Sequence, residues 1–222
     1  MKNELNIIVP AYKPIGFSTF DLIREIKKEI KIKTKIGHGG TLDPFASGVV
    51  LLLFGKATKK FEEIKTWEKT YIASLRFGYS SSTLDVEGEF TKTQCKKKPT
   101  KKEISKCLSS FVGTIEQEVP YFSASKYYGT PLYKLVRKNI FIKKTKKVKV
   151  KNVEIIFYRW PILNFKITTL GGAYIRAIAD EIGKKLNCSA FLFSLERERI
   201  GYFTKEKPLS LKEVVKKIKS FL

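Results

Sequence analysis

A glycine-rich segment near the N-terminus carries the residues best suited to chemistry. Gly37, Gly39 and Gly40 permit backbone conformations and close approaches that side chains would forbid. The same segment holds His38 and Asp43, an imidazole and a carboxylate, within six residues. Groups of this kind act as acids, bases or nucleophiles when a loop presents them to a substrate. The pattern is typical of an active-site loop.

Two other interpretations of this segment exist. An Asp before Pro44 is common in turns, and for an isolated segment we would take Asp43 as a turn residue and His38 as an ordinary loop histidine. A phosphate-binding P-loop is disfavoured, because no Gly-Lys-Ser/Thr sequence follows to open a helix. The context along the chain has to decide between an active site and a simple turn.

Patterns on both sides of the loop predict how it is held. Ser18 is a candidate N-cap, and apolar residues at helical spacing follow it, with basic residues on the other side. The apolar positions are Leu22, Ile23, Ile26 and Ile30, and the basic ones are Arg24, Lys27, Lys28 and Lys31. After the loop, residues 48–54 read as a fully buried strand. Asp43 is therefore expected at a loop beside the core.

The whole chain is predicted to be an α+β protein. Strand patterns dominate, are mostly joined by short links, and do not alternate regularly with helices. Strands are expected at 5–9, 68–77, 86–91, 147–158, 162–169, 190–195 and 200–203, with 68–77 and 86–91 forming a hairpin. Helices are expected at 100–111, near Pro131, at 174–186 and after Ser210. We predict one domain over residues 1–222, with a mixed, mostly antiparallel sheet flanked by helices.

The charge of the chain points to a polyanionic partner. Lys and Arg number 44 against 21 Asp and Glu, which leaves a formal net charge of +23. A field of that sign attracts polyanions and speeds their encounter, so nucleic acid is the first partner to consider. Lysines gather at 143–151 and at 27–35. Because Lys greatly outnumbers Arg, a solvated surface without a partner is the alternative.

The cysteines and the single histidine limit the chemistry further. Cys95, Cys107 and Cys188 are isolated, so neither a disulfide framework nor a Cys-x-x-Cys site is indicated, and a cytoplasmic protein is expected. With one His and no paired thiols, a structural zinc site has too few ligands. We predict no metal.

No segment suggests a membrane role. Pro10 and Pro14 interrupt the only apolar stretch near the N-terminus, so a signal peptide is not indicated. The longest apolar run, 49–54, is far shorter than the roughly 20 residues of a spanning helix.

Taken with its neighbours, the glycine-rich segment closely resembles the signature of the TruB family of tRNA pseudouridine synthases. The matching stretch runs from 37 to 50 and ends in Phe54-Gly55-Lys56-Ala57-Thr58-Lys59. Other matching segments follow in the family's order, at 13–18, 69–71, 82–88, 120–129, 133–137 and 171–183. The resemblance covers roughly residues 5–204, so it concerns a whole domain and not one motif.

Three departures from the family pattern concern RNA contacts. Gly39 stands where Thr is usual, Leu170 where Lys is common, and Glu196 interrupts a usual Leu-Arg-Arg triplet after Leu195. The chain ends soon after Ser210, so a short form without the C-terminal RNA-binding domain of the PUA type is expected.

The resemblance implies a reaction. Enzymes of this family isomerise uridine 55 in the T arm of tRNA: the C1′–N1 bond breaks, the uracil turns, and C5 joins C1′. Neither a redox change nor a net group transfer occurs, so no cofactor is expected. The resemblance further implies the pseudouridine synthase fold and a tRNA T-arm stem-loop as partner. Protein partners stay unknown, and we expect a monomer.

It also implies roles for individual residues. Asp43 matches the catalytic carboxylate, although the sequence leaves open whether it attacks the sugar or the base. Arg176 matches an arginine that pairs with that carboxylate and keeps it ionised. Tyr71 matches an active-site tyrosine suited to stack on uracil and to move a proton at the ribose.

The remaining site residues are predicted to hold a base that is flipped out of its stack. His38 matches a histidine that contacts the flipped region. Asp85, Tyr174 and Leu195 match positions that contact or enclose the base. Lys13 would reach a phosphate or structure the site.

Two rival functions stay open at this point. One is a non-catalytic RNA-binding or tRNA-folding protein, against which the presence of Asp43, Tyr71 and Arg176 speaks. The other is a pseudouridine synthase that acts on a different RNA.

Overall fold

The computed structural model describes residues 5–206 and 208–221, and the chain divides into two compact units. Met1–Tyr71 together with Leu195–Leu222 forms the first, which we call the terminal unit, and Ile72–Ser194 forms the second, the central unit. The single domain that the sequence suggests stays a prediction, to which the structure adds this internal division.

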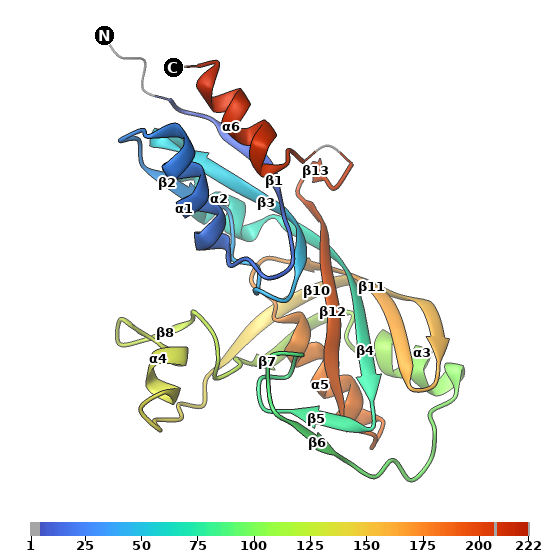
Figure 1. Ribbon diagram of the computed structural model, residues 1–222. Helices are drawn as coiled ribbons and strands as arrows, with labels where there is room; N and C mark the ends of the chain where they lie inside the picture. The colour runs from blue at the N-terminus through green and yellow to red at the C-terminus, as the bar shows by residue number, and fades with distance from the viewer. Residues whose placement is uncertain (1–4, 207, 222) are drawn as a thin grey trace. The chain divides into compact units, whose positions relative to one another are not determined.

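The terminal unit contains a mixed sheet in the order β1-β3-β12-β4 (Figure 1). Strand β1 lies antiparallel to β3, and β12 lies parallel to it. The short strands β2 and β13 add antiparallel pairs to β3 and β12. The bounds are β1 Ile8–Lys13, β2 Ile36–His38, β3 Ser47–Phe54, β4 Glu68–Phe77, β12 Ala190–Ile200 and β13 Phe203–Thr204. Strands β4 and β12 continue into the central unit.

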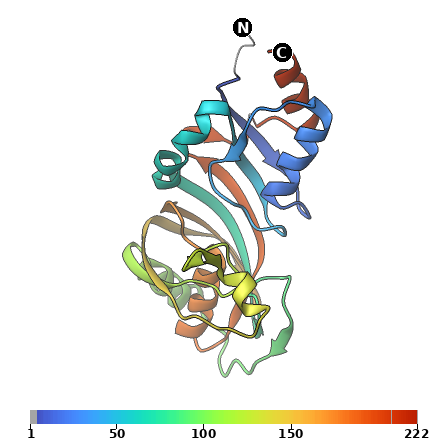
Figure 2. The same ribbon diagram turned by 90° about the vertical axis from the view of Figure 1, so that its left-hand side faces the viewer.

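Helices of the terminal unit pack against β1, β2, β3 and one another. They are α1 Thr19–Ile30, the 3-10 helix η1 Gly55–Lys60, α2 Phe61–Thr66 and α6 Leu211–Lys219. Val49, Leu51 and Leu53 of β3 pack with Ile64 and Ile200 into the core. Helix α1 packs against α6 and β2 (Figure 2). Both α1 and α6 begin with a capping box, in which the cap hydroxyl and the third helical residue's carboxylate each accept a backbone N–H.

The central unit contains a sheet in the order β12-β4-β11-β10-β7 (Figure 1). Strand β10 lies antiparallel to both β11 and β7. The elements not yet given are β5 Tyr79–Ser81, β6 Phe90–Lys92, α3 Lys101–Ser109, β7 Gly113–Glu118, β8 Lys126–Tyr127, β9 Thr130–Pro131, α4 Leu132–Val136, β10 Thr145–Arg159, β11 Ile162–Leu170 and α5 Ile175–Lys185. Across the described residues of both units, no helix has the length and hydropathy needed to cross a bilayer.

The predicted α+β class with a mostly antiparallel sheet is confirmed, and so are the elements that local signals define. The caps at Ser18 and Ser210 and the buried strand at Ser47–Phe54 lie where the sequence placed them. The hairpin between 68–77 and 86–91 is wrong. Instead, β5 and β6 pair with each other in a separate two-stranded sheet.

The first strand is also displaced from its predicted position. It was expected at 5–9 but runs from Ile8 to Lys13, through Pro10. Tyr12 donates its N–H to the Leu209 carbonyl, and Leu209 donates to the Pro10 carbonyl, so residues 10 and 12 direct their backbone groups away from β3. The missing N–H of Pro10 therefore removes no hydrogen bond between β1 and β3.

The expectation of unpaired cysteines is wrong for two of the three. Cys95 and Cys188 form a disulfide within the central unit, across a sequence separation of 93 residues. Cys107 is free and buried. A pair so distant in sequence leaves no spacing signal.

Candidate active site

The glycine-rich loop of the terminal unit connects β2 to β3 and is fixed by hydrogen bonds along its length. Gly39 donates its N–H to the Leu51 carbonyl at 2.8 Å. The Thr19 hydroxyl accepts the Leu42 N–H at 3.0 Å, next to the start of α1. Gly16 donates to the Pro44 carbonyl at 2.9 Å. The loop that carries Asp43 is thus tied to β3, to α1 and to the turn before α1.

Arg197 of β12 is a large charged residue whose side chain is buried against this loop. Its side chain is 1% exposed. Nε donates to the Val49 carbonyl at 2.7 Å, Nη1 to the Thr41 carbonyl at 3.2 Å, and Nη2 to the Gly40 carbonyl at 3.1 Å. A buried charge is tolerated only when such bonds replace its hydration. Arg197 therefore fixes the loop through the loop's own backbone.

Gly48 allows β12 to approach β3 closely enough for this arrangement. Its φ is +116°, and a Cβ there would lie 2.3 Å from the Arg197 carbonyl oxygen and 2.6 Å from the Arg197 nitrogen. Gly40, whose carbonyl accepts from Arg197, has a φ of +131°. Only glycine adopts these conformations without strain.

Lys13 holds the other side of the loop. Its side chain is fully buried, and Nζ donates to the carbonyls of Pro14, Phe17 and Pro44, at 2.9, 2.5 and 3.2 Å. The ammonium group thus joins the turn before α1 to the residue that follows Asp43. The contacts of Lys13 are therefore with the backbone of the protein and hold the loop in place.

Asp43 and Tyr71 lie close enough to interact electrostatically. Asp43 is half-buried, whereas Tyr71 is almost fully buried. Burial raises the pKa of the Tyr71 hydroxyl, the Arg197 guanidinium opposes this by its charge and a hydrogen bond, and the Asp43 charge raises the pKa further. Tyr71 therefore keeps its proton at neutral pH, beside a carboxylate that stays accessible.

His38 is held as a neutral ring at the edge of the same loop. Its Nδ1 accepts the Gly40 N–H at 3.2 Å, which places the ring proton on Nε2. Phe20 and Phe61 lie edge-to-face with the imidazole, at centroid distances of 5.1 and 6.3 Å. Burial, and then the charge of Arg197, lower the pKa of His38.

The charge of Arg197 also acts on Lys69. Burial, and then Arg197, lower the pKa of Lys69 to about 8. Its ammonium group donates to the carbonyls of Ile64, Lys65 and Trp67 at the end of α2. This lysine caps a helix beside the loop.

A second cluster of predicted site residues lies in the central unit. Arg176, at the start of α5, forms an ion pair with Asp85 at 3.3 Å, and both side chains are nearly inaccessible. Its guanidinium also donates to the carbonyls of Thr83 and Phe122, at 3.0 and 2.7 Å. Asp85 Oδ1 accepts from the Thr83 hydroxyl at 2.6 Å and from the Glu87 N–H at 3.0 Å. The pair is buried and well hydrogen-bonded.

The two other predicted base contacts have simpler surroundings. Tyr174 is half-buried, and its backbone N–H and carbonyl bond to the side chain of Gln117. The Lys146 ammonium lies over the Tyr174 ring, 4.1 Å from its centroid. Leu195 is a buried residue of β12.

The structure thus gathers Asp43, Tyr71 and His38 around Arg197, and pairs Asp85 with Arg176. The predicted pairing of Arg176 with Asp43 stays a prediction. Sequence reasoning missed Arg197 altogether. A signal was present, because Arg197 alternates with the buried Leu195 on one face of a strand, which predicts burial.

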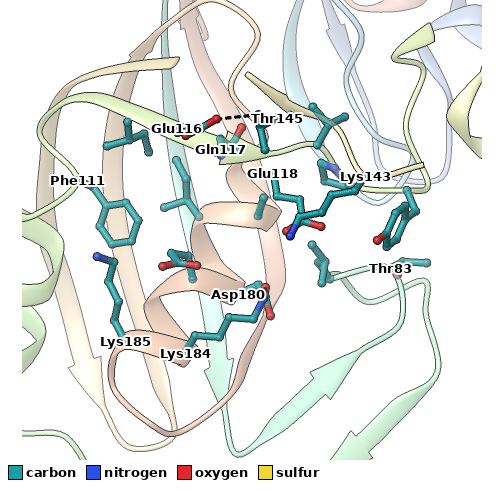
Figure 3. Close-up of a pocket in the computed structure, with 18 of the residues that line it drawn as sticks. Thr83, Phe111, Glu116, Gln117, Glu118, Lys143, Thr145, Asp180, Lys184 and Lys185 are labelled. Atoms are coloured by element: carbon teal, nitrogen blue, oxygen red, sulfur yellow. Dashed lines mark hydrogen bonds and ion pairs between the residues drawn. The ribbon is translucent and has the colours of Figure 1, made fainter. Parts of the chain in front are cut away.

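A cavity of about 490 Å³ lies in the central unit, between β7 and α5 (Figure 3). Its walls carry both charges: Glu116 and Glu118 come from β7, and Asp180 and Lys184 from α5. Thr83 and Phe122, whose carbonyls accept from Arg176, also line it. All of its lining residues belong to the central unit, so no residue of the glycine-rich loop contributes to it.

Known structures share this fold. The chain matches one in the solved Cbf5-Nop10-Gar1 complex with a TM-score of 0.73 and 25% identity, over 94% of this chain and 53% of that one. It therefore spans about half the length of that neighbour. A second neighbour, from an H/ACA RNP bound to a substrate RNA containing 2'-deoxyuridine, has a TM-score of 0.69 and 23% identity, over 94% of this chain and 52% of that one.

Curated relatives define the class. The tRNA pseudouridine synthase B of Clostridium tetani is 37% identical over 95% of this chain and 73% of the relative. That of Protochlamydia amoebophila is 40% identical over 96% of this chain and 80% of the relative. The fold and the glycine-rich loop are thus those of a pseudouridine synthase, an isomerase. The model of the TruB family pseudouridylate synthase N-terminal domain matches residues 27–175, and the chain belongs to the TruB family.

The close approach at Gly48 leads to a test by substitution. Gly48→Ala should lower the free energy of unfolding by more than about 1 kcal/mol, because the new methyl group meets the Arg197 backbone. Gly113→Ala is the matched control, since Gly113 has a φ of +113° but open space around it. Denaturant titration of both variants separates the clash from the backbone strain. Equal losses would remove the close approach as the cause.

His38 is the only histidine of the chain, so its titration can be followed alone by NMR. We expect its pKa below the ordinary value of 6.5. The unfolded chain then takes up this proton near pH 6.5 and the folded chain only at lower pH, so the folded state loses stability as the pH falls through 6.5. His38→Gln should lose less stability over that range, and an equal loss in both proteins would contradict the assignment.

Proposed function

We propose that this chain converts uridine 55 in the T arm of tRNA to pseudouridine, with Asp43 as the catalytic carboxylate. Membership of the TruB family and the names of the relatives support tRNA as the substrate. The observation that carries the proposal is the loop around Asp43, whose backbone is fixed by the buried Arg197 and Lys13 while the carboxylate stays accessible.

Asp43 would act on the nucleotide that is being rearranged. The reaction breaks the C1′–N1 bond, turns the uracil and joins C5 to C1′. C5 loses its proton and N1 gains one, so the composition of the nucleotide is unchanged. A carboxylate at a fixed position can form or stabilise the intermediate without a cofactor. The rigid loop supplies that position, because its carbonyls are held by Arg197 and cannot shift independently.

Tyr71 would bear on the base and the ribose. Its ring lies almost fully buried next to the charge of Asp43, and its raised pKa keeps the hydroxyl protonated. A protonated hydroxyl can donate a hydrogen bond or pass a proton, while the ring offers a face for stacking. Tyr71→Phe would separate these roles, since it keeps the ring and removes the hydroxyl.

The other predicted residues keep their proposed roles. Arg176 would orient Asp43, and Asp85, Tyr174 and Leu195 would contact or enclose the base. His38, held neutral, would contact the flipped region as a stacking group and not as an acid. We also propose that the protein acts as a monomer in the cytoplasm.

Mapping of the product tests the function itself. Transcribed tRNA is incubated with the purified protein, and pseudouridine is mapped at every uridine. Product at uridine 55 is expected. Product at another position, or only in another RNA, would favour a synthase with a different substrate. Binding without product anywhere would favour the non-catalytic RNA-binding protein.

The role of Asp43 is tested by one isosteric change. Asp43→Asn should lower the single-turnover rate by more than about 1,000-fold, because an amide cannot act as an anionic nucleophile. Binding of tRNA should stay within about threefold, since the shape of the loop is kept. Glu63→Gln removes an exposed carboxylate of α2 in the same unit and should change neither quantity. A rate near that of the parent protein would exclude Asp43 from the reaction.

The exposed lysines of β10 predict strong salt dependence of binding. Lys147, Lys149 and Lys151 are all exposed. If about five phosphates are contacted, log K should fall against log salt concentration with a slope of roughly −3.5 to −4.5. Lys149→Gln should flatten that slope by about 0.7 to 0.9, while Asp43→Asn leaves it unchanged. A nearly flat slope for the parent protein would mean that the lysines are a solvated surface without a partner.

A further inference from the structure

Helix α1 presents an exposed aromatic residue close to the loop that carries Asp43. Phe20, the second residue of α1, is 61% exposed. Ile15 and Phe17, in the turn before the helix, are exposed as well. An apolar patch on so basic a protein is a candidate binding surface.

Hydrogen bonds fix this part of α1 to the glycine-rich loop. Thr19, next to Phe20, accepts the Leu42 N–H through its hydroxyl at 3.0 Å. The Phe20 ring lies at 88° to the imidazole of His38, with the centroids 5.1 Å apart. His38 is held in turn by the Gly40 N–H. Phe20 therefore has a defined place beside the site and is not a freely moving surface residue.

The same face of α1 is basic beyond Phe20. Arg24 and Lys27 follow at intervals of four and three residues, which places them along one side of the helix, and Lys31 caps its C-terminal end in the left-handed conformation. All three are exposed, and Arg24 pairs with Asp21 at 3.0 Å, whereas a neighbouring face of the helix carries the buried residues Leu22, Ile23, Ile26 and Ile30. The outer face thus begins with an aromatic ring at the glycine-rich loop and continues as a row of cations.

We propose that Phe20 stacks on an unpaired base of the RNA substrate, next to the target uridine, while Lys27 and Lys31 contact the phosphates of the same strand. This proposal rests on the proposed function. Aromatic rings that stack on splayed bases, flanked by cations for the phosphates, are how proteins hold single-stranded RNA. The cations of α1 and the exposed ring fit RNA better than an apolar protein partner, because an apolar surface would have to desolvate the lysines without neutralising them.

The proposal is tested by affinity for a T-arm stem-loop RNA. Phe20→Leu should weaken binding by about 5- to 160-fold, the range found when a base loses its aromatic partner. Phe20→Trp should restore binding, because it offers a larger ring. Phe221→Leu, which changes another exposed phenylalanine of the terminal unit, should have no effect. Phe20→Leu should leave the salt slope unchanged, whereas Lys27→Gln should flatten it by about 0.7 to 0.9.

Photo-crosslinking then identifies the contact directly. 5-Iodouridine is placed singly at each unpaired position of the stem-loop, and cross-linked peptides are identified by mass spectrometry. We expect a cross-link to Phe20 from a position next to the target uridine. Parental affinity of Phe20→Leu with no such cross-link would overturn the proposal.

Two further outcomes are distinguishable. Loss of a dimer in Phe20→Leu, with RNA affinity unchanged, would overturn the proposal and make this face an interface between copies of the chain. Product formation by the parent protein is recorded in the same samples. A cross-link and an affinity loss without any product would keep the stacking proposal and reject the proposed isomerase function.

Discussion

The buried guanidinium of Arg197 is the interaction on which the terminal unit's site depends. It bonds the backbone carbonyls of Gly40, Thr41 and Val49, and its own backbone lies against Gly48. A charge without water must be satisfied by such dipoles, and those dipoles are thereby fixed. Burial is the larger cause of the lowered pKa of His38 and of Lys69 and of the raised pKa of Tyr71, and the same cation lowers the pKa of all three groups. One side chain thus holds the backbone of the loop and contributes to its electrostatics.

A buried ion pair in the central unit corresponds to the buried Arg197 of the terminal unit, whose charge is satisfied by backbone carbonyls. Arg176 bonds Asp85 and two carbonyls from distant loops, and Asp85 accepts from Thr83 and Glu87. Breaking one partner of such a pair leaves an uncompensated charge, which typically costs about 3–5 kcal/mol. Substitutions at Arg176 or Asp85 therefore change folding as well as any contact with the substrate, and a loss of activity there carries less meaning than one at Asp43.

The parts of the fold that could be predicted are those set by local patterns. The cap residue Ser18 directly precedes α1, and the apolar run lies within β3 itself, so a few neighbouring residues are enough to predict each element. The errors concern which segments pair: β6 pairs with the short strand β5 and not with β4, and Cys95 bonds Cys188 across 93 residues. Arg197 belongs to the same class, because its bond to Val49 spans 148 residues and a charged residue in a strand is usually solvated. The proposed roles of Asp43 and Tyr71 came from the family resemblance, and the structure adds how the loop around Asp43 is held.

Hydrogen–deuterium exchange in an Arg197→Lys variant shows whether Arg197 holds the loop around Asp43. Lysine keeps the charge but cannot bond three carbonyls from one planar group. We expect faster exchange of the amides in residues 39–46, with unchanged exchange in strand β11 of the central unit, Ile162–Leu170. Exchange in 39–46 that matched the parent protein would contradict the claim that Arg197 holds the loop around Asp43.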